Sequence, residues 1–303
     1  MKTIKFVEKV KNPLIKSCPC SVGCLSCNYV VISQILNCPY NCTYCYLHSF
    51  YGKDDIVVVK DENKILSEVK EYMQKAYRPL RIGTGEYSDS LALKEAHSLS
   101  IKLIDLFSKQ DQHLLELKTK SLNIEPFLSL GHKGKTVMAW SVNPEVVARI
   151  EEFDSPSPLE RIVAAKKCVA AGYPVAFHFD PIIYFDNWAN EYGQFIDYLF
   201  SQIPAEKIAW ISLGTLRFPL KQKQIIKEKF SHSKLNLDVM MQGDDNKLRY
   251  PEELRFKLYQ YIYQKIRHLI KEVYVYLCME LPRMWQKLEI KNSFNPNFYY
   301  FVR

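Results

Sequence analysis

Seven of the nine cysteines lie within residues 18–48, and their spacing is that of metal ligands. The spacing C-x3-C-x2-C occurs twice, first in Cys20, Cys24 and Cys27 and then in Cys38, Cys42 and Cys45. Cysteines grouped this closely hold a metal ion or an iron–sulfur cluster, or they form disulfides. The choice among these chemistries depends on the redox compartment and on the elements that position each triplet.

The bulk composition indicates a globular protein of a reducing compartment. Of the 303 residues, 48% are hydrophobic and 24% are charged, as in ordinary soluble domains. No run approaches the roughly 18 apolar residues of a membrane span, and the N-terminus lacks the apolar core of a secretory signal. We therefore expect a cytoplasmic protein with no membrane partner, in which clustered cysteines bind metal in preference to forming disulfides.

The charge leaves nucleic-acid binding open. A formal charge of +8 permits a polyanionic partner such as DNA but does not require one. Basic residues between positions 249 and 267 are mixed with tyrosines, which suits either a DNA-facing surface or a solvated helix face.

Downstream of the cysteines, short apolar runs alternate with amphipathic stretches. The apolar runs predict strands at 29–36, 80–83, 113–119, 136–142, 175–180, 208–214 and 273–279. The amphipathic stretches predict helices at 61–75, 92–109, 158–171, 188–202, 221–229 and 251–271, with a loop at 238–249. This alternation favours parallel strands joined by helical crossovers, in an α/β barrel or an open sheet. We expect a main domain at 29–303, with a helical, aromatic-rich C-terminal part, after a cysteine-rich segment at 1–28.

The second triplet has the context of a catalytic site. It follows an apolar strand directly, in the loop where parallel α/β folds place their chemistry. Three thiolates can hold three irons of a [4Fe–4S] cluster and leave the fourth iron open to a ligand. A structural zinc ion usually takes four protein ligands, and a zinc or ferredoxin-type site is the alternative for this triplet.

The same triplet resembles the radical S-adenosylmethionine signature, C-x3-C-x-aromatic-C, with Tyr44 in the aromatic position where the first triplet has Ser26. The chain further resembles the spore photoproduct lyase family, most specifically in CTYCYL at 42–47. Other matching stretches follow in order: KTK at 118–120, SVN at 141–143, AGYP at 171–174, DPI at 180–182, Trp188 and RF at 217–218. The resemblance implies a partial (β/α)6 TIM-like barrel of the radical S-adenosylmethionine type, with the cluster at its C-terminal mouth.

The resemblance also implies an activity. Such enzymes use a [4Fe–4S] cluster and S-adenosylmethionine to make a 5′-deoxyadenosyl radical, and in this family the radical acts on a thymine photoproduct in DNA. An electron donor such as a flavodoxin or ferredoxin would reduce the cluster. Two alternatives are a radical enzyme with a different substrate and a non-catalytic iron–sulfur or zinc protein that binds nucleic acid.

Four residues are implied as contacts of S-adenosylmethionine. Glu86, in the TGE stretch at 84–86 that matches a GGE-like motif, would bind the amino group, with Ser88 near the methionine end. Lys120 would meet the carboxylate and Ser141 the ribose. A solvated strand-end lysine and a strand-end cap are the alternatives for Lys120 and Ser141.

The resemblance gives the catalytic hydrogen transfers to tyrosine and cysteine. Tyr46 would pass a hydrogen atom back to 5′-deoxyadenosine with the help of Tyr44, although both tyrosines would also suit cluster shielding. The family's lyase has a donor cysteine after the second strand, whereas here Glu86 falls at or next to that place. A carboxylic O–H bond is too strong to replace a thiol. Either another group, such as Tyr46 or Cys278, supplies the hydrogen atom or the substrate differs.

Further polar and cysteine side chains are candidates with weaker signals. With Cys18, the first triplet supplies four thiols in ten residues (Cys18, Cys20, Cys24 and Cys27), enough for zinc or a second iron–sulfur cluster, or for a reduced cysteine set without metal. His178, Asp180 and Arg217 stand at strand ends as substrate contacts or satisfied polar groups. Cys168 is expected to be a buried core thiol.

Overall fold

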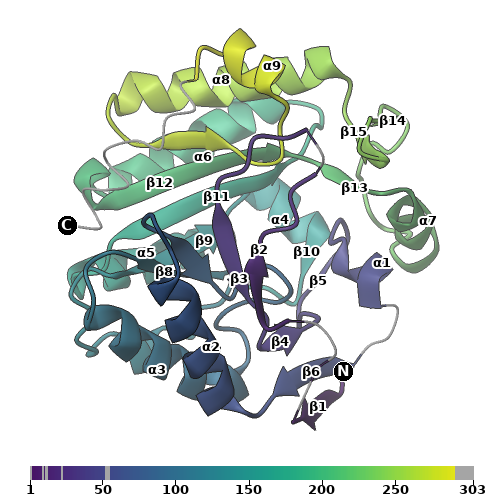
Figure 1. Ribbon diagram of the computed structural model, residues 1–303. Coiled ribbons are helices and arrows are strands. Elements are labelled where there is room, and N and C mark those ends of the chain that lie inside the picture. The colour runs from purple at the N-terminus through teal and green to yellow at the C-terminus, as the bar shows by residue number, and fades with distance from the viewer. Residues whose placement is uncertain (1, 9, 11–12, 22, 52–54, 291–303) are drawn as a thin grey trace.

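The computed structural model describes residues 2–8, 10, 13–21, 23–51 and 55–290, and its centre is a curled eight-stranded sheet (Figure 1). The strand order is β16-β12-β11-β9-β8-β7-β3-β2. The parallel strands are β3 (Tyr29–Ile32), β7 (Arg81–Gly83), β8 (Leu114–Thr119), β9 (Thr136–Ser141), β11 (Val175–Ile182), β12 (Ile208–Thr215) and β16 (Val275–Leu277). Strand β2 (Ile15–Ser17) runs antiparallel to β3 at one edge. The predicted partial barrel is confirmed, and β16 adds one parallel strand to the six of its core.

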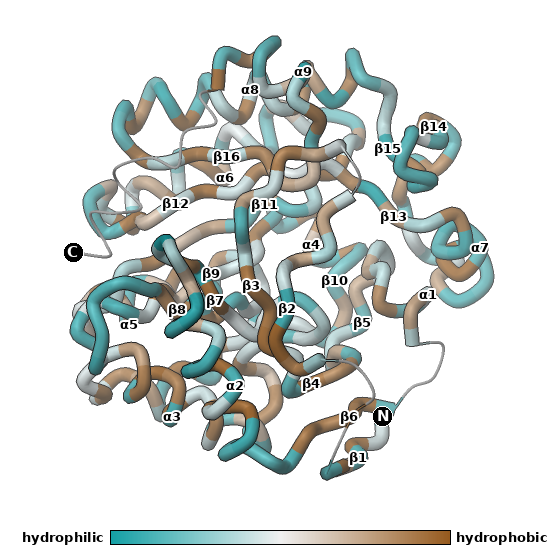
Figure 2. The backbone as a smooth tube through the Cα atoms, in the orientation of Figure 1, coloured by the Kyte–Doolittle hydropathy of each residue, from teal (hydrophilic) through white to brown (hydrophobic). Residues whose placement is uncertain are grey.

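Helices connect successive strands and cover the outer face of the sheet (Figure 1). They are α2 (Glu62–Gln74), α3 (His97–Ser108), α4 (Glu145–Glu151), α5 (Pro158–Ala170), α6 (Trp188–Gln202) and α8 (Glu252–Leu269). The start of α5 is fixed by a capping box. The Ser157 hydroxyl accepts the backbone N–H of Glu160, and the Glu160 carboxylate accepts the backbone N–H of Ser157. Figure 2 shows the consequence of the apolar patterning, with hydrophobic strands inside and hydrophilic helix surfaces outside.

Two of the predicted elements differ in the structure, and α4 and β2 were not predicted. The predicted strand at 29–36 is broken by a turn, so that β4 (Ile35–Leu36) joins a separate small sheet with β6 (Ile56–Val59) and β1 (Ile4–Val7). The predicted loop at 238–249 is wrong, because it contains β14 (Met241–Gln242) and β15 (Lys247–Arg249), which pair with β13 (Arg217–Pro219). Leu248 of β15 pairs with Phe218 of β13, and both side chains are buried. This burial stabilises the β14–β15 hairpin, which is too polar to be stable alone.

The cysteine-rich N-terminal residues join the two edges of the sheet. We call residues 18–28, apart from residue 22, the N-terminal strap. The strap continues from β2 at one edge, and Leu25 donates its backbone N–H to the Glu280 carbonyl, 3.0 Å away, just beyond β16 at the other edge. In Figure 1 the purple chain runs from β2 to the yellow end of the barrel. Because β2 pairs with β3, the segment at 1–28 shares a sheet with the main domain, and the boundary at residue 28 stays a prediction.

Among the described residues, no helix is both long and apolar enough to cross a membrane.

Candidate active site

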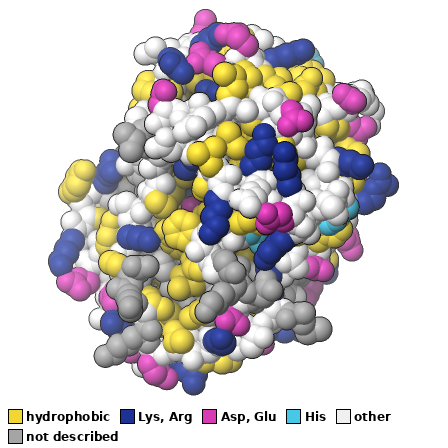
Figure 3. Space-filling view, turned by 90° about the vertical axis from the view of Figure 1, so that its right-hand side faces the viewer, with side chains coloured by type: hydrophobic (Ala, Val, Ile, Leu, Met, Phe, Trp, Pro, Cys, Tyr) yellow, Lys and Arg dark blue, Asp and Glu magenta, His cyan; other side chains and the backbone are white. Residues whose placement is uncertain are grey.

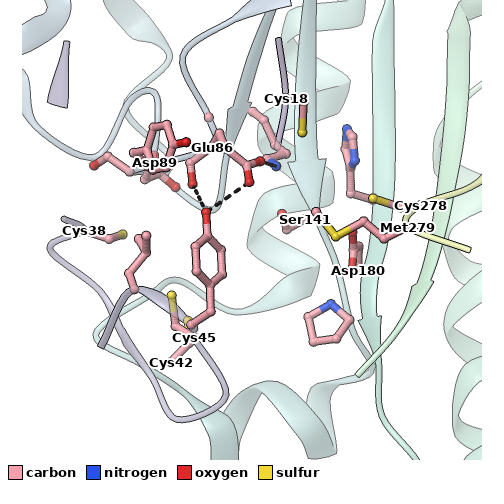
Figure 4. A pocket seen from close by; sticks show the side chains of 18 of the residues that line it. Cys18, Cys38, Cys42, Cys45, Glu86, Asp89, Ser141, Asp180, Cys278 and Met279 are labelled. Carbon is pink, nitrogen blue, oxygen red and sulfur yellow. Dashed lines mark hydrogen bonds and ion pairs between the residues drawn. The ribbon is translucent and has the colours of Figure 1, made fainter. Parts of the chain in front are cut away.

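A cavity of about 490 Å³ lies at the carboxyl ends of the barrel strands (Figure 4). Its lining includes every residue that the sequence predicts for the main site, namely Cys38, Cys42, Cys45, Tyr44, Tyr46, Glu86, Ser88, Lys120 and Ser141. Cys18 and Cys27 of the strap also line the cavity, whereas Cys20 and Cys24 are not part of its lining. The fold therefore gathers side chains from the ends of several strands around one space, as parallel barrels do.

The cysteine loop, residues 37–46, is attached to the barrel by a short two-stranded sheet. Strand β5 (Asn41–Cys42) pairs antiparallel with β10 (Glu152–Phe153), which follows α4. At the start of the loop Asn37 adopts a positive φ of 74°, and its side-chain oxygen accepts the N–H of Cys38 at 2.8 Å. Asparagine tolerates this left-handed conformation better than most residues do. The loop geometry is thus determined locally and by pairing.

A buried carboxylate, Glu152, holds the loop from behind. It forms an ion pair of 2.6 Å with Arg161, and both side chains are fully buried. It also accepts the Tyr44 hydroxyl at 2.5 Å and the Asn143 amide at 3.0 Å. Burial alone would raise the pKa of Glu152, but Arg161 and the other donors hold it at about 2. Tyr44 is therefore tied to an ionised acid behind the loop.

The three loop thiols face the cavity. Burial raises the pKa of Cys42 to about 12, with the Lys120 ammonium opposing the rise, and burial also raises the pKa values of Cys38 and Cys45. Within the described part of the chain, no three Cys, His, Asp or Glu side chains converge as ligands of one metal ion. A [4Fe–4S] cluster binds each thiolate through a different iron, so its ligands do not have to meet at one point.

The loop after β7 brings Glu86 and Ser88 to the cavity. The Tyr46 hydroxyl donates to the Glu86 carbonyl at 2.8 Å and to its carboxylate at 3.0 Å, the two dashed bonds of Figure 4. The Ser88 hydroxyl is buried and has no hydrogen-bond partner among the described residues. Gly85 allows this loop to approach β8, since a Cβ at this position would lie 2.6 Å from the Cβ of Lys118. The unpartnered hydroxyl and the thiols fit a polar cofactor held beside an iron–sulfur cluster.

Asp89, which the sequence analysis did not single out, fixes Lys120. Its carboxylate accepts the backbone N–H of Lys120 at 2.6 Å and the Thr119 hydroxyl at 2.5 Å. It also accepts two backbone N–H groups of its own loop, those of Leu91 and Ala92, at 2.9 Å each. A loop aspartate is a signal for bonds to the backbone N–H groups that follow it, here those of Leu91 and Ala92, but the sequence does not identify its partners Thr119 and Lys120.

A second polar group lies across the cavity from the cysteine loop. Asp180 binds Arg217 through two hydrogen bonds of 2.9 and 3.2 Å, and Arg217 also contacts the Cys278 sulfur at 3.4 Å. Below them, His178 lies 2.7 Å from Glu116, whose pKa burial would raise but which Arg81 and His178 hold at about 2. His178 and Asp180 both line the cavity, and each is bound to a charged partner, so contact with a substrate stays a prediction for both residues. Cys168 is fully buried in α5, as expected.

A parallel partial barrel whose first loop presents C-x3-C-x-aromatic-C to a cavity at its C-terminal mouth is the arrangement of the radical S-adenosylmethionine enzymes. The comparison with known families agrees, because the model of the spore photoproduct lyase family matches residues 13–290. The chain belongs to the spore photoproduct lyase family of radical S-adenosylmethionine enzymes.

Two relatives agree with this membership, and two solved structures share the fold. The spore photoproduct lyase of Bacillus subtilis (strain 168) is 28% identical over 278 residues, which cover 89% of this chain and 74% of that protein. That of Clostridium acetobutylicum is 26% identical over 215 residues, covering 70% of this chain and 63% of that protein. The fold matches a solved spore photoproduct lyase complexed with dinucleoside spore photoproduct at a TM-score of 0.78, with 24% identity over 90% of this chain and 82% of that one. Streptococcus suis SuiB bound to S-adenosylmethionine matches at a TM-score of 0.53, with 13% identity, 87% of this chain and 53% of that one.

Proposed function

We propose that this protein repairs a thymine photoproduct in DNA by radical chemistry. The observation that carries the proposal is the single cavity lined both by the three cysteines of the loop and by polar side chains from the ends of β7, β8, β9 and β11. The family and the relatives named spore photoproduct lyase support the substrate class.

Cys38, Cys42 and Cys45 would hold a [4Fe–4S] cluster, and Glu86, Ser88, Lys120 and Ser141 would hold S-adenosylmethionine. When bound together, these groups supply a 5′-deoxyadenosyl radical. The Ser88 hydroxyl, unpartnered within the described residues, would gain its missing hydrogen bond from the bound cofactor. The Lys120 ammonium lies 5.8 Å from the centre of the Tyr44 ring, next to the loop, where a carboxylate could pair with it.

The two tyrosines of the loop would have different tasks. Tyr46 faces the cavity and shares its hydroxyl hydrogen with Glu86, so it can take part in hydrogen transfer. Tyr44 is bound to Glu152 behind the loop and would mainly hold the cysteines in place. This division supports the proposed relay role of Tyr46 and gives Tyr44 an assisting role as an anchor.

Cations at the cavity would attract a DNA strand. Lys16, Lys118, Arg217 and Lys247 all line it. On the outer face that carries β13, β15 and α7 (Leu220–Lys229), Lys and Arg side chains are interleaved with Asp and Glu (Figure 3). The lining also holds the carboxylates of Glu86, Asp89, Glu116 and Asp180, so its cations would act as individual phosphate contacts that position the strand.

The test is anaerobic turnover of the full chain reconstituted with iron and sulfide. With dithionite, S-adenosylmethionine and a dinucleoside spore photoproduct, we expect 5′-deoxyadenosine together with restored thymines. The variant C38A/C42A/C45A is the matched control and should form neither product. Formation of 5′-deoxyadenosine without restored thymines would favour a radical enzyme with another substrate, and absence of both products would contradict any radical enzyme.

A second metal site in the strap is also proposed, supported by the four thiols Cys18, Cys20, Cys24 and Cys27. Cys18 and Cys20 lie side by side, and the hydrogen bond from Cys18 lowers the pKa of Cys20 to about 6. Zinc and iron analysis of the C38A/C42A/C45A variant tests it, because metal retained after loss of the loop must lie elsewhere. A metal-free variant would contradict a second site. The flavodoxin or ferredoxin donor and the cytoplasmic location stay predictions.

A further inference from the structure

The wall of the cavity opposite the cysteine loop carries a thiol, that of Cys278. Cys278 directly follows β16, and its backbone N–H donates to the Leu213 carbonyl of β12 at 2.7 Å, so its backbone is held by the sheet. Figure 4 shows Cys278 beside Asp180, across the cavity from Cys38, Cys42 and Cys45. A substrate in this space would have the cluster side of the cavity on one face and this thiol on the other.

The contacts of Cys278 keep its sulfur in place. Arg217 donates an N–H to the sulfur at 3.4 Å and is itself held by the Asp180 carboxylate through two bonds. Burial raises the pKa of the Cys278 thiol well above its ordinary value, the Asp180 carboxylate adds to the rise, and Arg217 opposes it. The sulfur therefore retains its hydrogen at neutral pH.

Two residues that line the cavity each carry a buried polar atom without a hydrogen-bond partner among the described residues. The hydroxyl of Ser88, a residue only 6% exposed, has no partner among the described residues. The Nε of Arg217, next to Cys278, is likewise buried without a partner in the described part of the chain. Both residues line the cavity. Buried polar atoms are rarely left unpaired, so a polar ligand that reaches both walls would satisfy them.

The chemistry of repair, on which this inference rests, needs a hydrogen-atom donor. When the photoproduct bond has broken, one product carbon is left with an unpaired electron. We propose that Cys278 donates a hydrogen atom to this carbon radical. The S–H bond breaks, a C–H bond forms and a thiyl radical remains on sulfur. One electron from the donor that also reduces the cluster and one proton from solvent then restore the thiol, so atoms and electrons balance.

The other thiols of the cavity are less suited to this step. Cys38, Cys42 and Cys45 would be bound to iron and would have no hydrogen to give. Cys27 accepts a hydrogen bond of 3.1 Å from Arg81 and belongs, with Cys18, to the strap that is proposed to bind metal. Cys278 is therefore the cavity thiol that is both protonated and outside either proposed metal site.

The test compares full-length reconstituted wild type with C278A in deuterated buffer, with dithionite, S-adenosylmethionine and dinucleoside spore photoproduct. A thiol exchanges its hydrogen with solvent, so wild type should place deuterium on the product carbon that carried the radical. We expect C278A to form at least about tenfold less repaired product per 5′-deoxyadenosine. C278S should not restore repair, since the O–H bond is stronger than S–H. C168A, which removes the buried thiol of α5 outside the cavity, should match wild type.

Equal repair and equal deuterium incorporation by C278A and wild type would contradict the donor role alone. Wild type that forms 5′-deoxyadenosine but restores no thymine would contradict the proposed function and the donor role together.

Discussion

The cysteine loop and the N-terminal strap have the same C-x3-C-x2-C spacing but differ in what holds them. The loop is paired with β10, and Tyr44 within it is bound to the buried Glu152. The strap is held between the two edges of the sheet by isolated contacts. Examples are the hydrogen bonds of 2.7 Å from Lys247 to Ser21 and 3.0 Å from Leu25 to Glu280. All three loop thiols line the cavity, but only part of the strap set does. Spacing thus supplies ligands, whereas the supporting structure determines where they point.

The largest expected effect on stability comes from the buried ion pair behind the loop. R161A would leave the Glu152 carboxylate buried without its cation, so we expect a loss of about 3–5 kcal/mol in the free energy of unfolding. K167A is the matched control, because Lys167 on the same helix forms an exposed pair with Glu125 and should cost about 0–1 kcal/mol. Urea unfolding of both variants measures the difference. Equal losses in the free energy of unfolding would contradict the stabilising role of the Glu152–Arg161 ion pair.

The two tyrosines of the loop should separate stability from turnover. Y44F removes the donor to buried Glu152 and should cost about 1–3 kcal/mol in unfolding free energy. Y46F removes a hydroxyl from the cavity and should lower repair more than it lowers stability. Parallel urea unfolding and repair assays test this crossover. If Y46F were the less stable variant and the more active one, the assignment of the two roles would be reversed.

Acid should weaken the attachment of the loop. The pKa of Glu152 is held at about 2 in the folded chain, against 4.5 as its ordinary value. Its contribution to stability is therefore complete above pH 4.5 and is lost as the pH falls toward 2. E152Q should be less stable than wild type at pH 7 and should have a shallower decline between pH 4.5 and 2, as measured by urea unfolding. The same slope in both proteins would show that Glu152 is not the titrating group.

The smallest effect is expected in the strap. S21A removes the acceptor for Lys247 in a partly exposed hydrogen bond, so we expect a loss of at most about 1 kcal/mol in the free energy of unfolding. Hydrogen exchange of the strap amides should rise while the amides of the cysteine loop stay protected. A loss as large as that of R161A would show that the strap is held as firmly as the loop.

Much of the fold could be predicted from the sequence because its signals are local. The strand and helix periods placed seven parallel strands and the six helices α2, α3, α5, α6, α7 and α8 within a few residues, whereas α4 was not predicted, and the family motifs led to the cavity residues. The pairing of β5 with β10 and the ion pair of Glu152 with Arg161 were not predicted. Strands β5 and β10 have two residues each, too few to show a periodic pattern in the sequence. Nothing in the sequence distinguishes the buried Glu152 from an exposed glutamate at the end of a helix, because its burial depends on a distant partner. The path of the strap to β16 depends on tertiary contacts with Glu280 and Lys247, which no local pattern encodes.

The central claim is that the cysteine loop carries the radical chemistry and the strap does not. The most direct measurement is the anaerobic formation of 5′-deoxyadenosine by reconstituted wild type, C38A/C42A/C45A and C20A/C24A, with dithionite as reductant. Cys20 and Cys24 are the strap cysteines outside the cavity lining. We predict that the loop variant forms no product and that the strap variant stays within about twofold of wild type. Product from the loop variant, or its absence from the strap variant, would contradict the claim.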